Sequence, residues 1–219
     1  MAVLGFPNGS LSEHTRQLLE AVGMEMPPGL LTERKYSFPL PPSELYPFDG
    51  LLVLRPQDMP LAVSVGMVDA GFSGMDWLVE AGQIGESLVA VAAFDYSKAT
   101  TKKAPAIVVL GRPGQEFHDT EETIVATEYP VLARRRFKMA RIIVVRGKAE
   151  AWVVGGYAHF CVDLCDLGTT CRANNLVIVG EPIISSPTIL LARKDSPFLP
   201  AIRLFAEKLL RKFAELAEK

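Results

Sequence analysis

The sequence predicts an α/β fold of two lobes, with mixed sheets flanked by helices and a cleft between the lobes. Short apolar runs typical of strands alternate with helical patterns along most of the 219 residues. The chain passes from one group of these elements to another near residue 94 and returns near residue 182. We therefore expect lobe I to comprise residues 1–93 and 182–219, both ends of the chain, and lobe II to comprise residues 94–181.

Composition excludes several classes of protein. The formal net charge is −2, which lacks the basic excess of a broad nucleic-acid surface. No apolar run reaches the roughly 20 residues that span a bilayer, and the first ten residues do not resemble a secretory signal. We expect a cytoplasmic protein whose three cysteines, Cys161, Cys165 and Cys171, are small apolar fillers in a reducing compartment.

Lobe I begins with a strand, a glycine turn and a helix. Val3–Pro7 is a short apolar run that Asn8 and the following glycine interrupt. Ser10 stands three residues before Glu13, the spacing of a capping box, so a helix over residues 11–22 is expected. The turn would lie at the carboxyl end of a strand, where open α/β sheets bind their ligands.

Further along lobe I, strand-like residues 51–54 end at Arg55. Residues 66–80 are divided by glycines, and Ser73 there precedes a helix that starts near Asp76. A strand that runs into a helix N-terminus through serine and glycine is either a ligand contact or a simple tight turn. The chain ends in an amphipathic helix whose apolar stripe is formed by Phe198, Ile202, Phe205, Leu209, Phe213 and Leu216.

Lobe II leads to a loop that suits an oxyanion. Strands are expected over residues 107–110, 123–127, 141–146, 177–179 and 188–192 and helices over residues 131–138 and 157–164, with the last strand returning to lobe I. Gly168-Thr169-Thr170 then supplies backbone N–H groups and two hydroxyls, followed by a helical turn. Asp163, just upstream, either accepts hydrogen bonds from sugar hydroxyls or caps the turn. Phosphate plus ribose is the first ligand that this pattern suggests.

Six segments, in order, resemble the ATP phosphoribosyltransferase family. They are Leu4–Gly23, Glu33–Lys35, Arg55–Glu80, Val125–Pro130, Gly147–Glu150 and Asp163–Leu176. The resemblance implies a fold like that of type II periplasmic binding proteins. It also implies the first reaction of histidine biosynthesis, in which N1 of ATP attacks C1 of phosphoribosyl pyrophosphate (PRPP) and pyrophosphate leaves with inversion. The expected product is N1-(5-phosphoribosyl)-ATP.

The resemblance implies roles for particular residues. Asp163, Arg34 and Lys35 are the expected catalytic residues. The PRPP-binding set it implies is Asp163, Asp166, Gly168, Thr169, Thr170 and Glu150. Other candidates for the cleft are Asn8, Ser10, Arg55, Ser73, Asp76, Thr127 and His159. The implied cofactor is Mg²⁺, held through the substrate phosphates, with no protein ligand assigned.

The chain departs from the family pattern at Asn8, Ser10, His159 and Leu167. Two basic residues expected near the phosphates are replaced by Asn8 and Ser10. His159 can be interpreted as a replacement cation. A divergent, non-catalytic paralogue that binds a small ligand or serves as a subunit partner is therefore the alternative. The chain resembles the short form of the family. This implies a homo-oligomer and a separate regulatory subunit resembling histidyl-tRNA synthetase.

Overall fold

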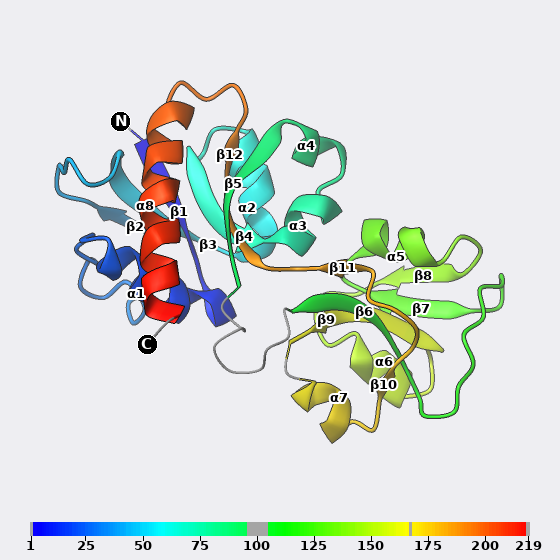
Figure 1. The fold of residues 1–219 in the computed structure, drawn as a ribbon. Helices are drawn as coiled ribbons and strands as arrows, with labels where there is room; N and C mark the ends of the chain where they lie inside the picture. Colours follow the sequence, from blue (N-terminus) through cyan, green and yellow to red (C-terminus); the bar gives the residue numbers. More distant parts are fainter. Residues whose placement is uncertain (1, 96–104, 167, 218–219) are drawn as a thin grey trace. The chain divides into compact units, whose positions relative to one another are not determined.

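A computed structural model of the chain describes residues 2–95, 105–166 and 168–217 (Figure 1). It comprises two compact units. Unit 1 is formed by Met1–Tyr96 with Pro187–Lys219, and unit 2 is formed by Ser97–Ser186. Leu167, one of the departures from the family pattern, lies outside the described residues.

Unit 1 is built on a six-stranded mixed sheet in the order β2-β3-β1-β4-β12-β5. Strand β1 is parallel to β3 and β4, whereas β12 is antiparallel to β4 and β5, and β2 is antiparallel to β3. The strand bounds are β1 Ala2–Pro7, β2 Ser37–Pro39, β3 Phe48–Leu54, β4 Ala70–Gly74, β5 Leu88–Phe94 and β12 Thr188–Arg193. The last strand of the chain thus lies inside a sheet that otherwise comes from the first 94 residues.

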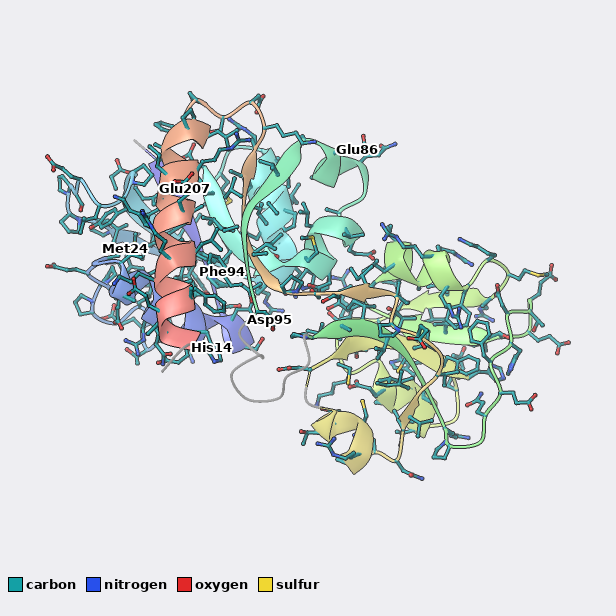
Figure 2. The ribbon with its side chains drawn as sticks, viewed as in Figure 1. His14, Met24, Glu86, Phe94, Asp95 and Glu207 are labelled. Atoms are coloured by element: carbon teal, nitrogen blue, oxygen red, sulfur yellow. The ribbon has the colours of Figure 1, made fainter. Side chains whose placement is uncertain are left out.

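Helices cover both faces of this sheet. Helices α1 (Ser12–Ala21) and α8 (Leu199–Ala217) pack on one face, and α2 (Met59–Ser64) and α3 (Met75–Glu80) pack on the other. The short helix α4 (Gln83–Glu86) contacts α2, and 3-10 turns occupy Gly9–Leu11 and Pro56–Asp58. Phe94 lies at the end of β5 (Figure 2), and its ring meets that of Phe213 of α8 edge to face, with ring centroids 5.5 Å apart.

The expected apolar stripe of the last helix is confirmed over most of its length. Ile202, Phe205 and Leu209 are buried, and Phe198 and Phe213 are partly buried against the same core. Leu216 is 47% exposed, so the buried stripe ends before the last turn of the helix.

Unit 2 contains a second mixed sheet in the order β10-β6-β9-β7-β8, with β11 also paired to β6. Strand β7 is parallel to β8 and β9, and β6 is antiparallel to β9, β10 and β11. The strand bounds are β6 Ala106–Gly111, β7 Ile124–Thr127, β8 Arg141–Val144, β9 Phe160–Cys165, β10 Val177–Ile178 and β11 Ile184–Ser185.

Three short helices accompany this sheet, α5 (Pro130–Arg136), α6 (Glu150–Val154) and α7 (Thr169–Ala173). The core on the α6 and α7 side contains Val153 and Cys171. An aromatic cluster forms a second apolar centre, in which the ring centroids of Phe137 and Phe160 lie 5.8 Å apart and both rings contact Phe117.

Two local predictions were wrong. The helix expected over residues 157–164 is instead strand β9, which lies between β6 and β7. A strand buried on both faces has a continuous apolar run, which periodicity cannot distinguish from a buried helix. The capping box at Ser10 is also absent. Helix α1 begins at Ser12, whose hydroxyl donates to the Gly9 carbonyl at 2.7 Å, and Ser10 lies in the preceding 3-10 turn.

Candidate active site

Unit 1 has a topological switch point at the carboxyl end of β1. Strand β1 lies between β3 and β4, and the helices that follow β1 and β3 pack on opposite faces of the sheet. Chains that leave neighbouring parallel strands in opposite directions open a crevice at this edge. Asn8 and Ser10 are exposed there, and the Asn8 N–H donates to the Leu54 carbonyl at 2.9 Å.

Three further candidates lie at the same edge. Arg55 is exposed directly after β3. Ser73, near the end of β4, is fully buried, and its hydroxyl donates to the Pro56 carbonyl at 2.7 Å. Asp76 is 2% exposed in the first turn of α3. Ser73 therefore connects two loops of the edge, while Arg55 can reach a ligand.

Arg34 and Lys35 approach this edge through strand register. Strand β2 runs antiparallel to β3 with Ser37 opposite Leu52, and the Val53 N–H donates to the Tyr36 carbonyl at 2.7 Å. Residues that precede β2 therefore lie toward the carboxyl end of β3. Both Arg34 and Lys35 are exposed, and the Lys35 ammonium lies 5.1 Å from the Phe38 ring centroid. The register therefore places Arg34 and Lys35 toward the end of β3 that Arg55 follows.

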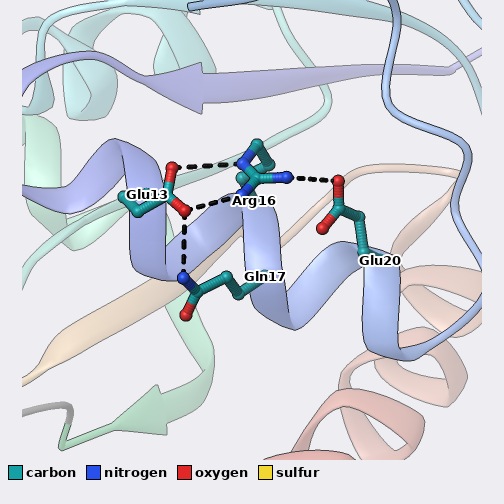
Figure 3. A network of polar contacts seen from close by, with 4 residues as sticks. All are labelled: Glu13, Arg16, Gln17 and Glu20. Carbon is teal, nitrogen blue, oxygen red and sulfur yellow. Dashed lines mark hydrogen bonds and ion pairs between the residues drawn. The ribbon is translucent and has the colours of Figure 1, made fainter.

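Arg16, the first cation after the Asn8 turn, is occupied by other groups. Its guanidinium contacts Glu13 at 2.6 Å and Glu20 at 2.5 Å, and Gln17 donates to Glu13 at 2.9 Å (Figure 3). With a carboxylate on each side, Arg16 is neutralised within α1. Arg16 therefore does not replace the basic residues that the family pattern has at the positions of Asn8 and Ser10.

Unit 2 has a switch point of its own at the carboxyl end of β7. Strand β7 lies between β9 and β8, and Thr127 is its last residue. The Thr127 hydroxyl is fully buried, donates to the Val162 carbonyl at 2.7 Å and accepts the Tyr129 N–H at 2.8 Å. Thr127 therefore fixes the turn after β7 against β9 and has no side-chain donor left for a ligand.

A group of carboxylates lies beside this switch point. Asp163 of β9 is half-buried and accepts the Leu164 N–H at 2.7 Å. Burial, followed by the negative charge of Glu150, raises the pKa of Asp163 to about 7, and Glu128 adds to the effect. Glu150 is the first residue of α6, and a hydrogen bond between it and Asp163 also favours the protonated acid. The carboxyl groups of Asp163, Glu150 and Glu128 thus repel one another when ionised, which raises the pKa of Asp163.

The predicted anion loop joins β9 to α7. Gly168 has φ of 65°, a left-handed conformation that glycine adopts without strain, and it precedes the first turn of α7. Asp166, Thr169 and Thr170 are exposed. A Cβ added at Gly168 would lie 3.2 Å from Nη1 of Arg172, so this guanidinium lies against the loop.

His159 lies at the other end of β9. The Ile124 N–H donates to His159 Nδ1 at 2.9 Å, and the His159 N–H donates to the Ile124 carbonyl at 2.9 Å. The Nδ1 atom of His159 is therefore occupied by the backbone at the start of β7. Four residues of strand, about 13 Å, separate it from Asp163. His159 thus joins the start of β9 to β7, and its role as a replacement cation stays a prediction.

The residue patterns missed two charged groups at this edge. Glu128 follows β7, and its carboxylate lies over the turn before α6, since a Cβ at Gly147 would be 3.5 Å from Glu128 Oε1. Arg172 carries a cation to the loop. The available signal for Arg172 was its position in the helical turn that follows Gly168. For Glu128 the signal was its position immediately after a predicted strand.

Within residues 2–95, 105–166 and 168–217, no group of three or more His, Cys, Asp or Glu side chains is arranged to hold a metal ion. The unbalanced charge around Asp163 and Glu150 still favours a cation that arrives with a ligand. Mg²⁺ commonly binds in this way, through substrate phosphates and few protein groups. No helix among these residues is long and apolar enough to cross a bilayer.

Sequence comparisons match this chain to one family. The family model described as ATP phosphoribosyltransferase matches residues 55–215. The ATP phosphoribosyltransferase of Desulfosudis oleivorans is 32% identical over 224 residues, covering 98% of this chain and 73% of the relative. That of Nitratidesulfovibrio vulgaris (strain DP4) is 33% identical over 199 residues, covering 87% of this chain and 64% of the relative. The chain thus spans about two thirds of the length of these curated relatives.

Solved structures share the fold. The ATP phosphoribosyl transferase (HisG:HisZ) complex from Thermotoga maritima contains a chain that matches with a TM-score of 0.78 and 24% identity, covering 98% of this chain and all of that one. A mutant of ArgBP from T. maritima matches with a TM-score of 0.60 and 11% identity, covering 99% of this chain and 90% of that one. The predicted fold class, mixed α/β and similar to type II periplasmic binding proteins, is confirmed.

Proposed function

This chain belongs to the ATP phosphoribosyltransferase family, and we propose on that premise that it transfers the phosphoribosyl group of PRPP to N1 of ATP and releases pyrophosphate. The observation that carries the proposal is the juxtaposition at the end of β9. Asp163 and Glu150 lie beside the switch point of unit 2, a few residues from the Gly168 loop. Carboxylates for ribose hydroxyls and N–H groups for a phosphate thus come from one edge of one sheet.

The proposed binding mode follows from these positions. Backbone N–H groups of Gly168, Thr169 and Thr170 receive the 5′-phosphate, and the Arg172 guanidinium adds a charge-assisted contact. Asp163 and Glu150 accept hydrogen bonds from the ribose hydroxyls. Binding favours their ionised forms, since hydroxyl donors stabilise the charge that burial penalises.

In the proposed reaction, C1 of the ribose gains positive character as the pyrophosphate oxygen departs and N1 of ATP approaches from the opposite face. The negative charge of Asp163 and Glu150 stabilises this developing cation. Arg34, Lys35 and Arg55 stabilise the departing pyrophosphate. Mg²⁺ bound through the substrate phosphates would add electrostatic stabilisation of the leaving group.

We further propose a homo-oligomer in the cytoplasm that works with a separate regulatory subunit resembling histidyl-tRNA synthetase. Support for the separate subunit comes from the T. maritima structure, which is a complex of HisG with HisZ. We also propose that Asn8, Ser10 and Asp76 contact a bound substrate.

The test is an assay of purified protein with ATP, PRPP and Mg²⁺, with pyrophosphatase present, alone and with a candidate regulatory subunit. We expect formation of the N1-phosphoribosyl product. Asp163→Asn should lower kcat/KM about ten- to a hundredfold, the effect of losing a charge-assisted hydrogen bond of about 1.5–3 kcal/mol. Asp195→Asn, at an exposed aspartate of unit 1, is the matched control and should retain full activity.

The result that rejects the proposal is the absence of both product and PRPP binding under all these conditions. That outcome would favour the non-catalytic alternative, to which the missing cations at Asn8 and Ser10 point.

A further inference from the structure

Two of the three cysteines form a thiol pair around the proposed phosphate loop. Cys165 is the last residue of β9, Cys171 is the third residue of α7, and their sulfur atoms lie 3.8 Å apart. All three cysteines are free thiols. The role of small apolar filler fits all three cysteines, because Cys161 and Cys171 are buried in the core of unit 2 and Cys165 packs against it. Cys165 and Cys171 are in addition in contact with each other beside a loop.

We propose that Cys165 and Cys171 are a redox modification site that closes to a disulfide by exchange with a low-molecular-weight disulfide such as oxidised glutathione. A disulfide needs sulfur atoms about 2.0 Å apart, so the pair must approach by roughly 2 Å. Cys165 is half-buried and Cys171 is buried, and rotation about their Cα–Cβ bonds moves the sulfur atoms over this range.

The two thiols have different roles in the exchange. Cys165 is the more accessible, so its thiolate attacks a sulfur of oxidised glutathione and releases one glutathione thiolate. Burial, followed by the neighbouring Cys165, raises the pKa of Cys171 to about 11, so Cys171 is the resolving thiol. It loses its proton, attacks the Cys165 sulfur and expels the second glutathione. The protein gives up two hydrogen atoms, and one disulfide of the oxidant becomes two thiols.

The closed ring would enclose the loop that carries Asp166, Gly168, Thr169 and Thr170. A Cβ at Gly168 would lie 3.9 Å from the Cys165 sulfur, so the pair lies directly beneath the turn. Drawing Cys171 toward β9 shifts the first turn of α7 and the N–H groups that point from it. We expect oxidation to weaken PRPP binding at least tenfold, and this consequence rests on the proposed function of the loop.

The chemical test uses the full chain incubated with oxidised glutathione. We expect loss of two of the three thiols, an intact mass lower by two hydrogen atoms, and a linked peptide pair containing Cys165 and Cys171. Dithiothreitol should restore all three thiols. Three unchanged thiols, a persistent glutathione adduct, or a disulfide between two chains would each overturn the proposal.

Matched variants separate the pair from the third cysteine. Cys165→Ala and Cys171→Ala should each prevent the internal disulfide, whereas Cys161→Ala should form it as the wild type does. Peptide mapping of the wild-type protein gives the same answer without relying on any variant to fold.

Calorimetry with PRPP then tests the consequence. We expect reduced protein to bind and oxidised protein to bind at least tenfold more weakly, with recovery after dithiothreitol. The double variant Cys165→Ala/Cys171→Ala should bind equally before and after the oxidant. Equal binding by mapped oxidised and reduced wild type would overturn the effect on the loop. Failure of the reduced protein to bind PRPP would instead reject the proposed function and leave the disulfide result intact.

Discussion

At the scale of single residues, the protonation of Asp163 links the site to stability. Its folded-state pKa of about 7 lies above the ordinary value of 3.8. Because the folded state binds this proton more tightly than the unfolded state, protonation of Asp163 favours folding fully below about pH 4. This contribution to stability is lost as pH rises through 7. At neutral and higher pH, the folded protein therefore bears the cost of an ionised carboxylate beside Glu150 and Glu128.

Asp163→Asn should remove this cost. We expect the variant to unfold with a free energy about 1–2 kcal/mol higher than wild type at pH 8.5 and nearly equal to it at pH 4.5. This estimate is reduced from the roughly 1.4 kcal/mol per pKa unit because solvent reaches the half-buried side chain. Urea unfolding from pH 4.5 to 8.5 measures the difference. A gap that does not widen with pH would show that Asp163 is ionised without penalty.

Arg172 gives a second prediction at this scale. Because its guanidinium lies against Gly168, Arg172→Ala should raise the KM for PRPP about tenfold and leave the KM for ATP within about twofold, as expected for one exposed charge-assisted contact. Arg172→Lys should recover part of the loss. Arg141→Ala, which removes an exposed arginine at the amino end of β8, is the control. Equal changes in both KM values would mean that Arg172 supports the whole unit instead of the phosphate.

At the scale of elements, hydroxyl groups show which strand contacts are fixed by hydrogen bonds. Thr127 joins β7 to β9 and to the following turn through two buried hydrogen bonds. Thr15 of α1 is equally buried, yet its hydroxyl oxygen has no hydrogen-bond partner among the described residues. The same substitution at these two positions should therefore have opposite effects.

Thr127→Val should lower the free energy of unfolding by about 2–3 kcal/mol, because it leaves a buried carbonyl and N–H group unsatisfied. Thr15→Val should be neutral or stabilising by up to about 1 kcal/mol, because a methyl group replaces a hydroxyl without a partner. Chemical denaturation of both variants measures these differences. Similar losses at both positions would contradict the assignment of the Thr127 bonds.

Elements were predictable from sequence where local periodicity and burial agree. The first strand is a short apolar run that ends at a glycine turn, and α8 has one continuous apolar stripe, so both were predicted correctly. Strand β9 was taken for a helix because Phe160, Cys161 and Val162 are all buried, which removes the alternation that identifies a strand. That burial depends on the partners β6 and β7, which local sequence does not contain.

The residues of the candidate site likewise fall into those that local sequence predicts and those that depend on distant pairing. Asp163 and Gly168 could be found because their spacing is local and matches a family pattern. For Glu128 the sequence held only a weak signal, its position after a predicted strand, because its proximity to Asp163 follows from the parallel pairing of β7 with β9. The contact of the His159 ring likewise depends on a hydrogen bond to Ile124, 35 residues away.

At the scale of the whole molecule, unit 1 is completed by the end of the chain. Strand β12 lies between β4 and β5, and its residues from Thr188 to Ala192 are at most 5% exposed. During synthesis, this sheet has an open position until the last 33 residues are available, whereas unit 2 is one continuous segment. Unit 2 can therefore fold first.

A chain that ends at residue 186 tests this order. We expect it to lose the cooperative unfolding of unit 1, because β5 loses its paired neighbour and α8 no longer covers the core. Unit 2 should keep slow amide exchange in β6, β7 and β9, since its contacts are internal. Slow exchange retained in β1 and β4 of the truncated chain would show that unit 1 does not need its terminal segment.

The pairing of β5 with β12 has a consequence for protein engineering. Phe94 lies opposite Thr188 in an antiparallel pair, so the two points at which the chain leaves and re-enters unit 1 are neighbours. A hairpin turn of about two to five residues could join them. Unit 2 is then a replaceable insert in a two-strand ribbon, and a minimal scaffold of unit 1 alone could accept another domain at the same junction.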